Sequence, residues 1–142
     1  MQRRMMTRSW AEIHQMYLKY ASLGSGQFTT EIHEMLQLVE RIEGSRHAEH
    51  LHAWMSHLYL NIIQVPAECT YDGPRLTICP MSTGKLVFYF LPDWKAVPPE
   101  LRSRLQNTVE AGLWQLECNA REGFATLEEC LYRMEWIRRE DA

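Results

Sequence analysis

The stretch LTICPMSTGKLVFYFL, residues 76–91, contains two apolar runs separated by a turn. Leu76–Met81 and Lys85–Leu91 are rich in β-branched, aromatic and aliphatic residues, which is typical of strands. Between them, Ser82-Thr83-Gly84 places a glycine where a short hairpin loop requires a positive φ. The stretch therefore predicts a β-hairpin, and the other elements are expected to pack around it.

Alternation along this hairpin gives it two apolar faces, because successive strand residues point to opposite sides of a sheet. The face expected in the core consists of Leu76, Ile78, Leu86, Phe88 and Phe90. The other face is unusually apolar for a surface in contact with water, and it consists of Thr77, Cys79, Val87, Tyr89 and Leu91. We expect a cover over this second face, either from helices of the chain or from a binding partner.

The segment before the hairpin, residues 58–65, is β-branched and aromatic and ends at Pro66, which favours a third strand. Leu51, Met55 and Leu58 would also continue a helical stripe, so a helix remains an alternative there. With the strand interpretation, the sheet is a small antiparallel meander of about three strands.

Two N-terminal helices are predicted from capping signals and apolar periodicity. Ser9 and Glu12 form a capping box that begins the first helix. The second begins at Thr29 or Thr30 and ends at Gly44. The short glycine-rich loop between them predicts an antiparallel helical hairpin. The expected core residues of the two helices are Trp10, Ile13, Tyr17, Ala21, Ile32, Met35, Leu36, Val39 and Ile42.

Three further helical stretches are predicted along the chain. Ser45 caps a stretch over residues 45–57, which contains four of the six histidines. Pro98-Pro99-Glu100 begins a long helix that covers residues 100–122 and ends at Gly123. A second capping box begins the last helix at Thr126. Its inward residues are expected to be Leu127, Cys130, Leu131, Met134 and Ile137.

These elements together predict an α+β fold: an N-terminal helical hairpin, a small antiparallel meander and two C-terminal helices that pack on the sheet. A chain of 142 residues can bury roughly 70% of the surface that its unfolded form exposes, so one domain over residues 1–142 is expected. Residues 1–8 are locally basic and are expected to form a flexible tail.

The composition argues against several classes of function. The net charge is −3, and the Lys and Arg residues are dispersed among Glu residues, so a nucleic-acid partner is not expected. No apolar run reaches the length of a membrane span, and no apolar segment follows the N-terminal arginines as in a signal peptide. We therefore expect a cytoplasmic protein without a membrane partner.

The four cysteines lack the short spacing of zinc ribbons and thioredoxin-like sites. We expect free and mostly buried thiols. A disulfide between Cys69 and Cys79 stays open as an alternative, because a hairpin could bring the two residues close together.

The histidines of residues 45–57 are the strongest candidates for chemistry. On an ideal helix they flank the apolar stripe and do not converge on one point. Only His47 and His50 have the spacing that two ligands on one helix require. We therefore predict no metal site, no cofactor and no catalytic residue. The alternative is a metal-binding protein or an enzyme that uses the His47/His50 cluster with Glu49. Its further ligands would come from a neighbouring chain or from the first helices, such as His14 or His33.

The second face of the hairpin and the aromatic residues of proline-bounded loops are the best candidates for contact with a partner. The predicted contact residues are Tyr71, Thr77, Val87, Tyr89 and Trp94. Small size, mild acidity and a lack of catalytic motifs are typical of bacterial immunity proteins, antitoxins and secretion chaperones. The leading hypothesis is thus a small intracellular, non-enzymatic protein-interaction module. A structural homodimer that buries the second face between two copies is a further alternative.

Overall fold

The computed structural model describes residues 5–22, 29–68, 71, 73–81, 84–91 and 114–137. The helices within these ranges are α1 (Trp10–Ser22), α2 (Thr29–Glu43) and α4 (Gly123–Arg133), with 3₁₀ turns η1 (Arg46–Glu49) and η3 (Ala120–Glu122). The strands are β1 (His52–Ser56), β2 (Tyr59–Ile63), β3 (Arg75–Met81), β4 (Lys85–Leu91) and β5 (Trp114–Asn119). All neighbouring strands pair antiparallel, in the order β1-β2-β3-β4-β5.

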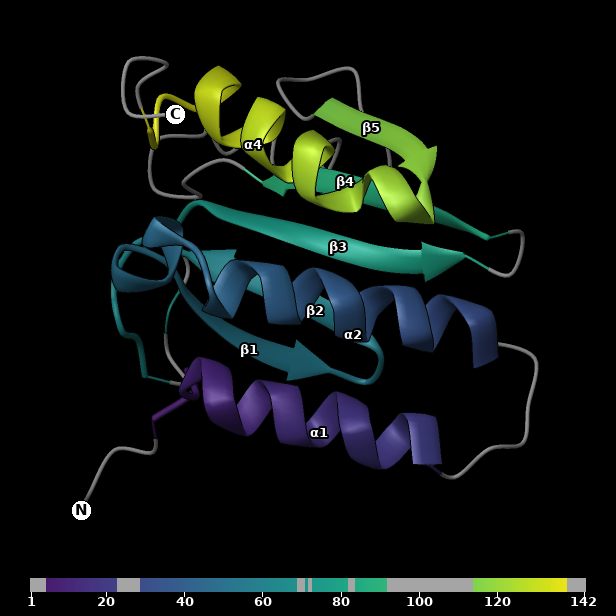
Figure 1. Cartoon of the computed structure of the whole chain (residues 1–142). Coiled ribbons are helices and arrows are strands. Elements are labelled where there is room, and N and C mark those ends of the chain that lie inside the picture. Colours follow the sequence, from purple (N-terminus) through teal and green to yellow (C-terminus); the bar gives the residue numbers. More distant parts are fainter. Residues whose placement is uncertain are drawn as a thin grey trace, which may run out of the picture.

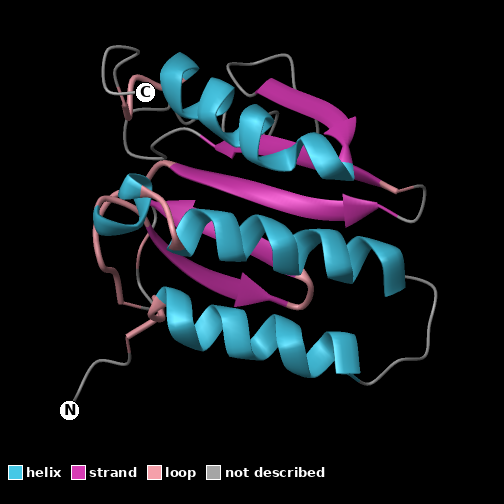
Figure 2. Ribbon diagram, in the orientation of Figure 1, coloured by secondary structure: helices cyan, strands magenta, loops and turns pink. Residues whose placement is uncertain are grey.

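The molecule has two layers, with α1, α2 and α4 on one face of the sheet (Figure 1, Figure 2). The predicted α+β class is confirmed, and α1 and α2 form the expected antiparallel pair. The sheet, however, has five strands and not about three. The two additional strands, β1 and β5, occupy its two edges, where the sequence patterns predicted helices.

The predicted hairpin is present as β3 and β4. Thr77 pairs with Tyr89 and Ile78 pairs with Phe88, so the two faces alternate as expected. Gly84 has a φ of 76°, the positive value that the turn required. The strand predicted within residues 58–65 is also confirmed, as β2, which pairs with both β1 and β3.

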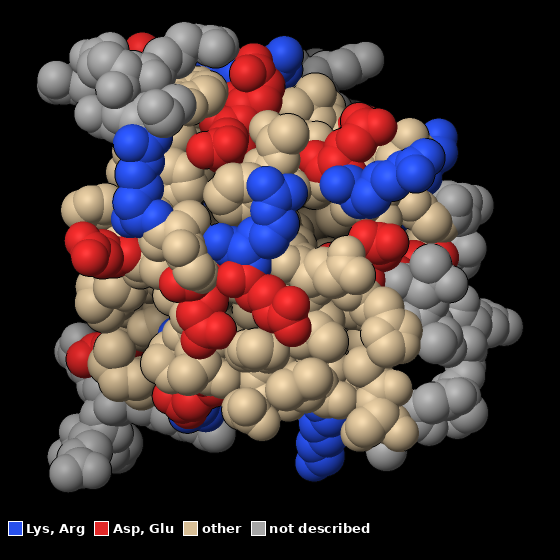
Figure 3. Space-filling view, viewed as in Figure 1, with Lys and Arg blue, Asp and Glu red and all other residues tan. Residues whose placement is uncertain are grey.

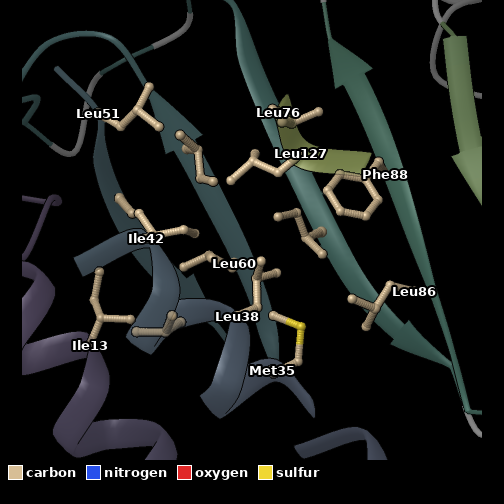
Figure 4. Close-up of a cluster of buried hydrophobic side chains, with 14 of the residues drawn as sticks. Ile13, Met35, Leu38, Ile42, Leu51, Leu60, Leu76, Leu86, Phe88 and Leu127 are labelled. Carbon is tan, nitrogen blue, oxygen red and sulfur yellow. The ribbon is translucent and has the colours of Figure 1, made fainter. Parts of the chain in front are cut away.

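The core lies between the helices and the sheet and receives side chains from every layer of the fold. Ile13 of α1 and Leu127 of α4 are fully buried there. The apolar stripe of α2 packs between them, as Figure 4 shows. The strand residues labelled in Figure 4, all fully buried, are Leu60, Leu76, Leu86 and Phe88. The predicted inward face of the hairpin is therefore the floor of the core.

Two aromatic side chains of α1 also hold this helix to the ends of β1. The indole Nε1–H of Trp10 donates to the carbonyl of Leu51 at 3.0 Å, and the hydroxyl of Tyr17 donates to the carbonyl of Leu58 at 2.9 Å. Ser9 and Glu12 form the predicted capping box, with the Glu12 N–H donating to Ser9 Oγ at 3.1 Å. Because each ring buries apolar area and also satisfies a backbone carbonyl, α1 has a defined position along the sheet.

The turn between β3 and β4 joins the two layers through Gly84. Its N–H donates to the carboxylate of Glu31 at 2.9 Å, and its carbonyl accepts from the Ala120 N–H at 3.0 Å. Glu31 is only 3% exposed, so its charge is held inside the protein by this contact near the start of α2. The turn thus fixes α2, β4 and the chain after β5 relative to one another.

The helix predicted over residues 45–57 is wrong. Only Arg46–Glu49 is helical, as the short turn η1, and His52–Ser56 forms the edge strand β1. His52 pairs with Ile63 and Trp54 with Asn61, so backbone pairing with β2 decides the conformation. The helical spacing of apolar residues there was coincidental. The positions expected for the histidines around an ideal helix therefore do not apply.

The helix predicted over residues 100–122 is wrong from residue 114 onward, and residues 100–113 lie outside the described residues. Trp114–Asn119 is β5, which pairs with β4 along its whole length. Gly123, expected to end that helix, is instead the first residue of α4, three residues before the predicted start at Thr126. The strand β5 and the short turn η3 (Ala120–Glu122) therefore precede α4.

Residues 5–8, which the sequence predicts to belong to a flexible tail, lie against the sheet. Met5 forms an isolated bridge with Glu68, and Arg8 forms one with Ala53. The Arg8 N–H donates to the Ala53 carbonyl at 2.8 Å. This segment is therefore bound to β1 at Arg8 and to the chain after β2 at Met5.

Charged side chains of both signs are interspersed on the face that carries the helices (Figure 3). Among the residues that the structure describes, no helix combines the length and the apolarity needed to cross a bilayer.

Gly123 occupies a close approach between α4 and the sheet, and this gives a test of the packing. A Cβ there would lie 2.9 Å from Leu86 Cδ1, and Leu86 is fully buried. We expect Gly123→Ala to lower the free energy of unfolding by about 1–3 kcal/mol because the core is overpacked. Chemical denaturation measures this difference.

Gly44→Ala is the matched control for this substitution. A Cβ at Gly44 would lie 3.5 Å from the Glu40 carbonyl oxygen, an ordinary contact. We expect a change within about 0.5 kcal/mol, or a small gain from the lower entropy of the unfolded chain. Equal losses in the two variants would show that the approach of α4 to Leu86 is not the tight contact described.

Candidate binding surface

The second face is the side of the sheet that points away from α1, α2 and α4. One row of its side chains crosses all five strands at directly paired positions. The row consists of Trp54, Asn61, Thr77, Tyr89 and Gln115. Residues at alternate positions along the same strands also belong to this face, among them Tyr59, Ile63, Arg75, Cys79, Met81, Lys85, Val87 and Glu117.

Four of the five predicted contact residues lie on or beside this face. Thr77, Val87 and Tyr89 are on adjacent strands β3 and β4. Tyr71 lies in the loop before β3 and meets Trp54 edge to face, with ring centroids 6.5 Å apart. Trp94 lies outside the described residues. Period-two alternation was sufficient to place the strand residues on one side.

The face is not uniformly accessible. Val87 and Cys79, which pair across β3 and β4, are only 3% and 6% exposed. Tyr59 and Met81 are 46% and 42% exposed, and Tyr89 is half-buried. Tyr59, Met81 and Tyr89 are therefore the aromatic and methionine side chains of this face that a partner can contact.

A small second core lies at the β1–β2 end of the face. It consists of the buried residues Trp54, Ile63 and Ala67, with Met6 and Tyr71 packed against them. The Tyr71 hydroxyl donates to the carbonyl of Pro74 at 2.6 Å. This contact closes the loop before β3 and holds the Tyr71 ring over that end of the sheet.

A polar pair is buried near the centre of the face. The Thr77 hydroxyl donates to Asn61 Oδ1 at 2.7 Å, and Asn61 is only 5% exposed. Because a buried amide is costly without a partner, this hydrogen bond fixes the Thr77 side chain. The pair lies between Trp54 and Tyr89 in the row that crosses the sheet.

Arg75 is a feature of the second face that sequence reasoning missed. Its side chain is half-buried, and its Nε atom is fully buried without a hydrogen-bond partner among the described residues. Burial away from water lowers the pKa of this guanidinium below its ordinary value. Because Leu76 points into the core, strand alternation could have predicted that the adjacent Arg75 lies on the second face. No sequence pattern could have predicted that Arg75 lacks a partner among the described residues.

The ionisable groups near Tyr89 indicate how closely this face is packed. The pKa of Tyr89 is raised, mainly by burial and further by Cys79, Tyr59 and Glu117. Burial raises the pKa of the Cys79 thiol to about 11, so it stays protonated and weakly nucleophilic near neutral pH.

Cys79 is a free thiol, while Cys69, its partner in the alternative disulfide, lies outside the described residues. Cys118 and Cys130 are also free thiols.

Two of the histidines, His47 and His14, join elements of the fold. His47 is 4% exposed, and its Nε2 lies 3.0 Å from Glu128 Oε2 of α4. His14 of α1 lies between two carboxylates of α2, 3.3 Å from Glu40 and 3.0 Å from Glu43. Each histidine therefore pairs a helix or turn with a different helix.

His47 and His14 are thus paired with carboxylates of different helices, α4 and α2. Within the described part of the chain, no three His, Cys, Asp or Glu side chains are arranged to hold a metal ion.

Comparison with protein-family models, with curated proteins and with solved structures gave no match to this chain. The candidate surface is therefore assigned from its own geometry.

The contact between His47 and Glu128 predicts a stability effect. Glu128→Ala leaves the buried His47 ring without this partner, and we expect the free energy of unfolding to fall by about 1–3 kcal/mol. Glu40→Ala is the control, because Glu40 is half-exposed and His14 keeps Glu43. We expect at most about 1 kcal/mol there. Urea denaturation of both variants would contradict this account if Glu40→Ala proved the more costly change.

Proposed function

We propose that this chain is a small, non-enzymatic protein-interaction module that holds a protein partner against the second face of its sheet. The observation that carries the proposal is the presence of Tyr59, Met81 and Tyr89 on one face. Tyr59 and Met81 there are almost half exposed. Aromatic and methionine side chains are enriched in the buried parts of protein interfaces, which supports this assignment.

The setting of these side chains favours specific binding. They project from strands in the middle of a five-stranded sheet, so their positions are fixed before a partner arrives. Little conformational entropy is lost when such groups become buried, and a larger share of the contact energy remains for affinity. The half-buried Tyr89 is the expected centre of the contact, because interface residues with large effects lie in desolvated positions.

Polar groups adjoin this apolar centre on the β5 side. Lys85 Nζ lies 3.3 Å from Glu117 Oε1, and both side chains are about half exposed. A polar rim beside an apolar centre is usual in protein interfaces. We infer that the rim contributes to orientation and the centre to affinity.

The type of partnership that we favour is occlusion or chaperoning of another protein inside the cell, as bacterial immunity proteins, antitoxins and secretion chaperones do. A second copy of this chain is the competing partner. Mass measurement in solution separates the two, because a homodimer doubles the mass without any other protein present.

The test is a charge introduced on the second face. We expect Tyr59→Glu and Tyr89→Glu to abolish capture of a specific partner from native lysate, or to dissociate a homodimer, because a carboxylate would be buried in an apolar contact. Tyr20→Glu is the control, because Tyr20 is 38% exposed on α1 in the helix layer. Thermal melting checks that each variant is folded. Retained capture in both variants of the second face, with loss in Tyr20→Glu, would move the interface to the helices.

A further inference from the structure

Arg75 of the second face has hydrogen-bonding capacity that the fold does not use. Among the described residues, its buried Nε–H has no acceptor and no ion pair joins Arg75 to an acidic side chain. Arg8 and Arg133, by contrast, lie at the surface beside acidic residues four positions away in the chain, at 4.0 Å from Glu12 and 3.4 Å from Glu129. Arg75 is thus the less hydrated cation and also the one without a carboxylate.

This arrangement costs the free protein stability. Removing a guanidinium from water is unfavourable unless an acceptor replaces the lost hydration, and an unsatisfied N–H adds to that cost. The lowered pKa of Arg75 has the same physical cause. A cation at such a position is expected to contribute to binding, because proteins commonly have lower stability at sites that binding requires.

The side chains around Arg75 form an apolar and aromatic setting. If the pairing of Ile62 with Leu76 is continued by one residue, Ile63 lies opposite Arg75. Tyr71 is close enough to influence the charge of Arg75, and its ring packs directly over Gly73. Trp54 stands against Tyr71. A guanidinium in these surroundings forms a stronger ion pair than one in bulk water, because the local dielectric constant is lower.

We propose that Arg75 is the anchor for a carboxylate side chain of the protein partner, received beside Tyr71 on the second face. Because the Nε atom of Arg75 is buried, the terminal N–H groups of its guanidinium would supply the two parallel N–H···O hydrogen bonds that a carboxylate accepts. A single cation neutralises one carboxylate, whereas phosphate groups are usually bound by clusters of arginines. The partner is therefore a protein that presents an Asp or Glu within an apolar contact.

This inference rests on the proposed function, because the carboxylate arrives as part of a partner bound to the second face. The ion pair between Arg75 and this carboxylate would lie at one end of the second face, beside the aromatic centre formed by Tyr59 and Tyr89. The ion pair would set the orientation of the partner, since a buried charge tolerates only a complementary group.

The first test needs only the free protein. Arg75→Met keeps the unbranched apolar stem of the side chain and removes the uncompensated cation, so we expect a melting temperature equal to or above that of the unchanged protein. A lower melting temperature would show that the fold itself depends on the guanidinium, and it would overturn the proposal.

The second test follows the Arg75 Nε–H signal by NMR, assigned by its loss in Arg75→Met. The probes are a blocked peptide of five glutamates, the corresponding peptide of five glutamines, and inorganic phosphate. We expect a saturable shift of the signal with the glutamate peptide, at concentrations about five-fold lower or more than for either other probe. The Nε–H of Arg121, which is exposed on η3, is the control and should respond weakly and equally to all three. An unmoved Arg75 signal, or a stronger response to phosphate, would overturn the carboxylate anchor.

Partner capture separates this inference from the proposed function. Loss of capture in both Tyr59→Glu and Arg75→Met supports the two together. Loss in Tyr59→Glu with full capture in Arg75→Met would retain the interaction module and refute the anchor. Full capture in both variants would refute both.

Discussion

The alternation of side chains along β3 and β4 is the constraint from which both faces of the sheet follow. Leu76, Ile78, Leu86 and Phe88 are fully buried beneath the helices, and each adjacent residue necessarily points the other way. A slip of one residue would exchange the two faces and expose the floor of the core. Gly84 secures the register, because its N–H binds the buried carboxylate of Glu31 and its carbonyl accepts from Ala120. The same turn that begins β4 therefore also fixes α2 and the approach to α4.

Two histidines that were candidates for chemistry, and the hydroxyl of the buried Tyr17, join elements of the fold. His47 binds Glu128 across η1 and α4, His14 binds two glutamates across α1 and α2, and Tyr17 reaches the carbonyl of Leu58. Each contact gives a buried or half-buried polar atom a partner, so it avoids a penalty as much as it adds an attraction. Such pairs define the angles and positions of elements that apolar packing alone would leave adjustable.

Arg75 departs from this rule, and the departure gives the second face its functional interest. Its buried Nε–H has no acceptor among the described residues, while Asn61 on the same face has one in Thr77. The face therefore contains both satisfied polar groups, which stabilise the sheet, and one unsatisfied cation beside aromatic residues. A binding surface needs unsatisfied polar groups, because a group that is already paired within the protein gains little from a hydrogen bond to a partner.

Local patterns in the sequence determined the β3–β4 hairpin, β2, the capping box of α1 and the buried stripe of α2, because each depends on residues within one turn or one pleat. The edge strands β1 and β5 were decided by tertiary structure. Their apolar spacing also fits a helix, and pairing with β2 and β4 selects the strand. The strand alternation predicted which residues face away from the helices. That Arg75 lacks a partner there, while His47 has one in Glu128 at a distance of 81 residues, depends on which distant side chains meet in space. Sequence spacing carries no record of such contacts.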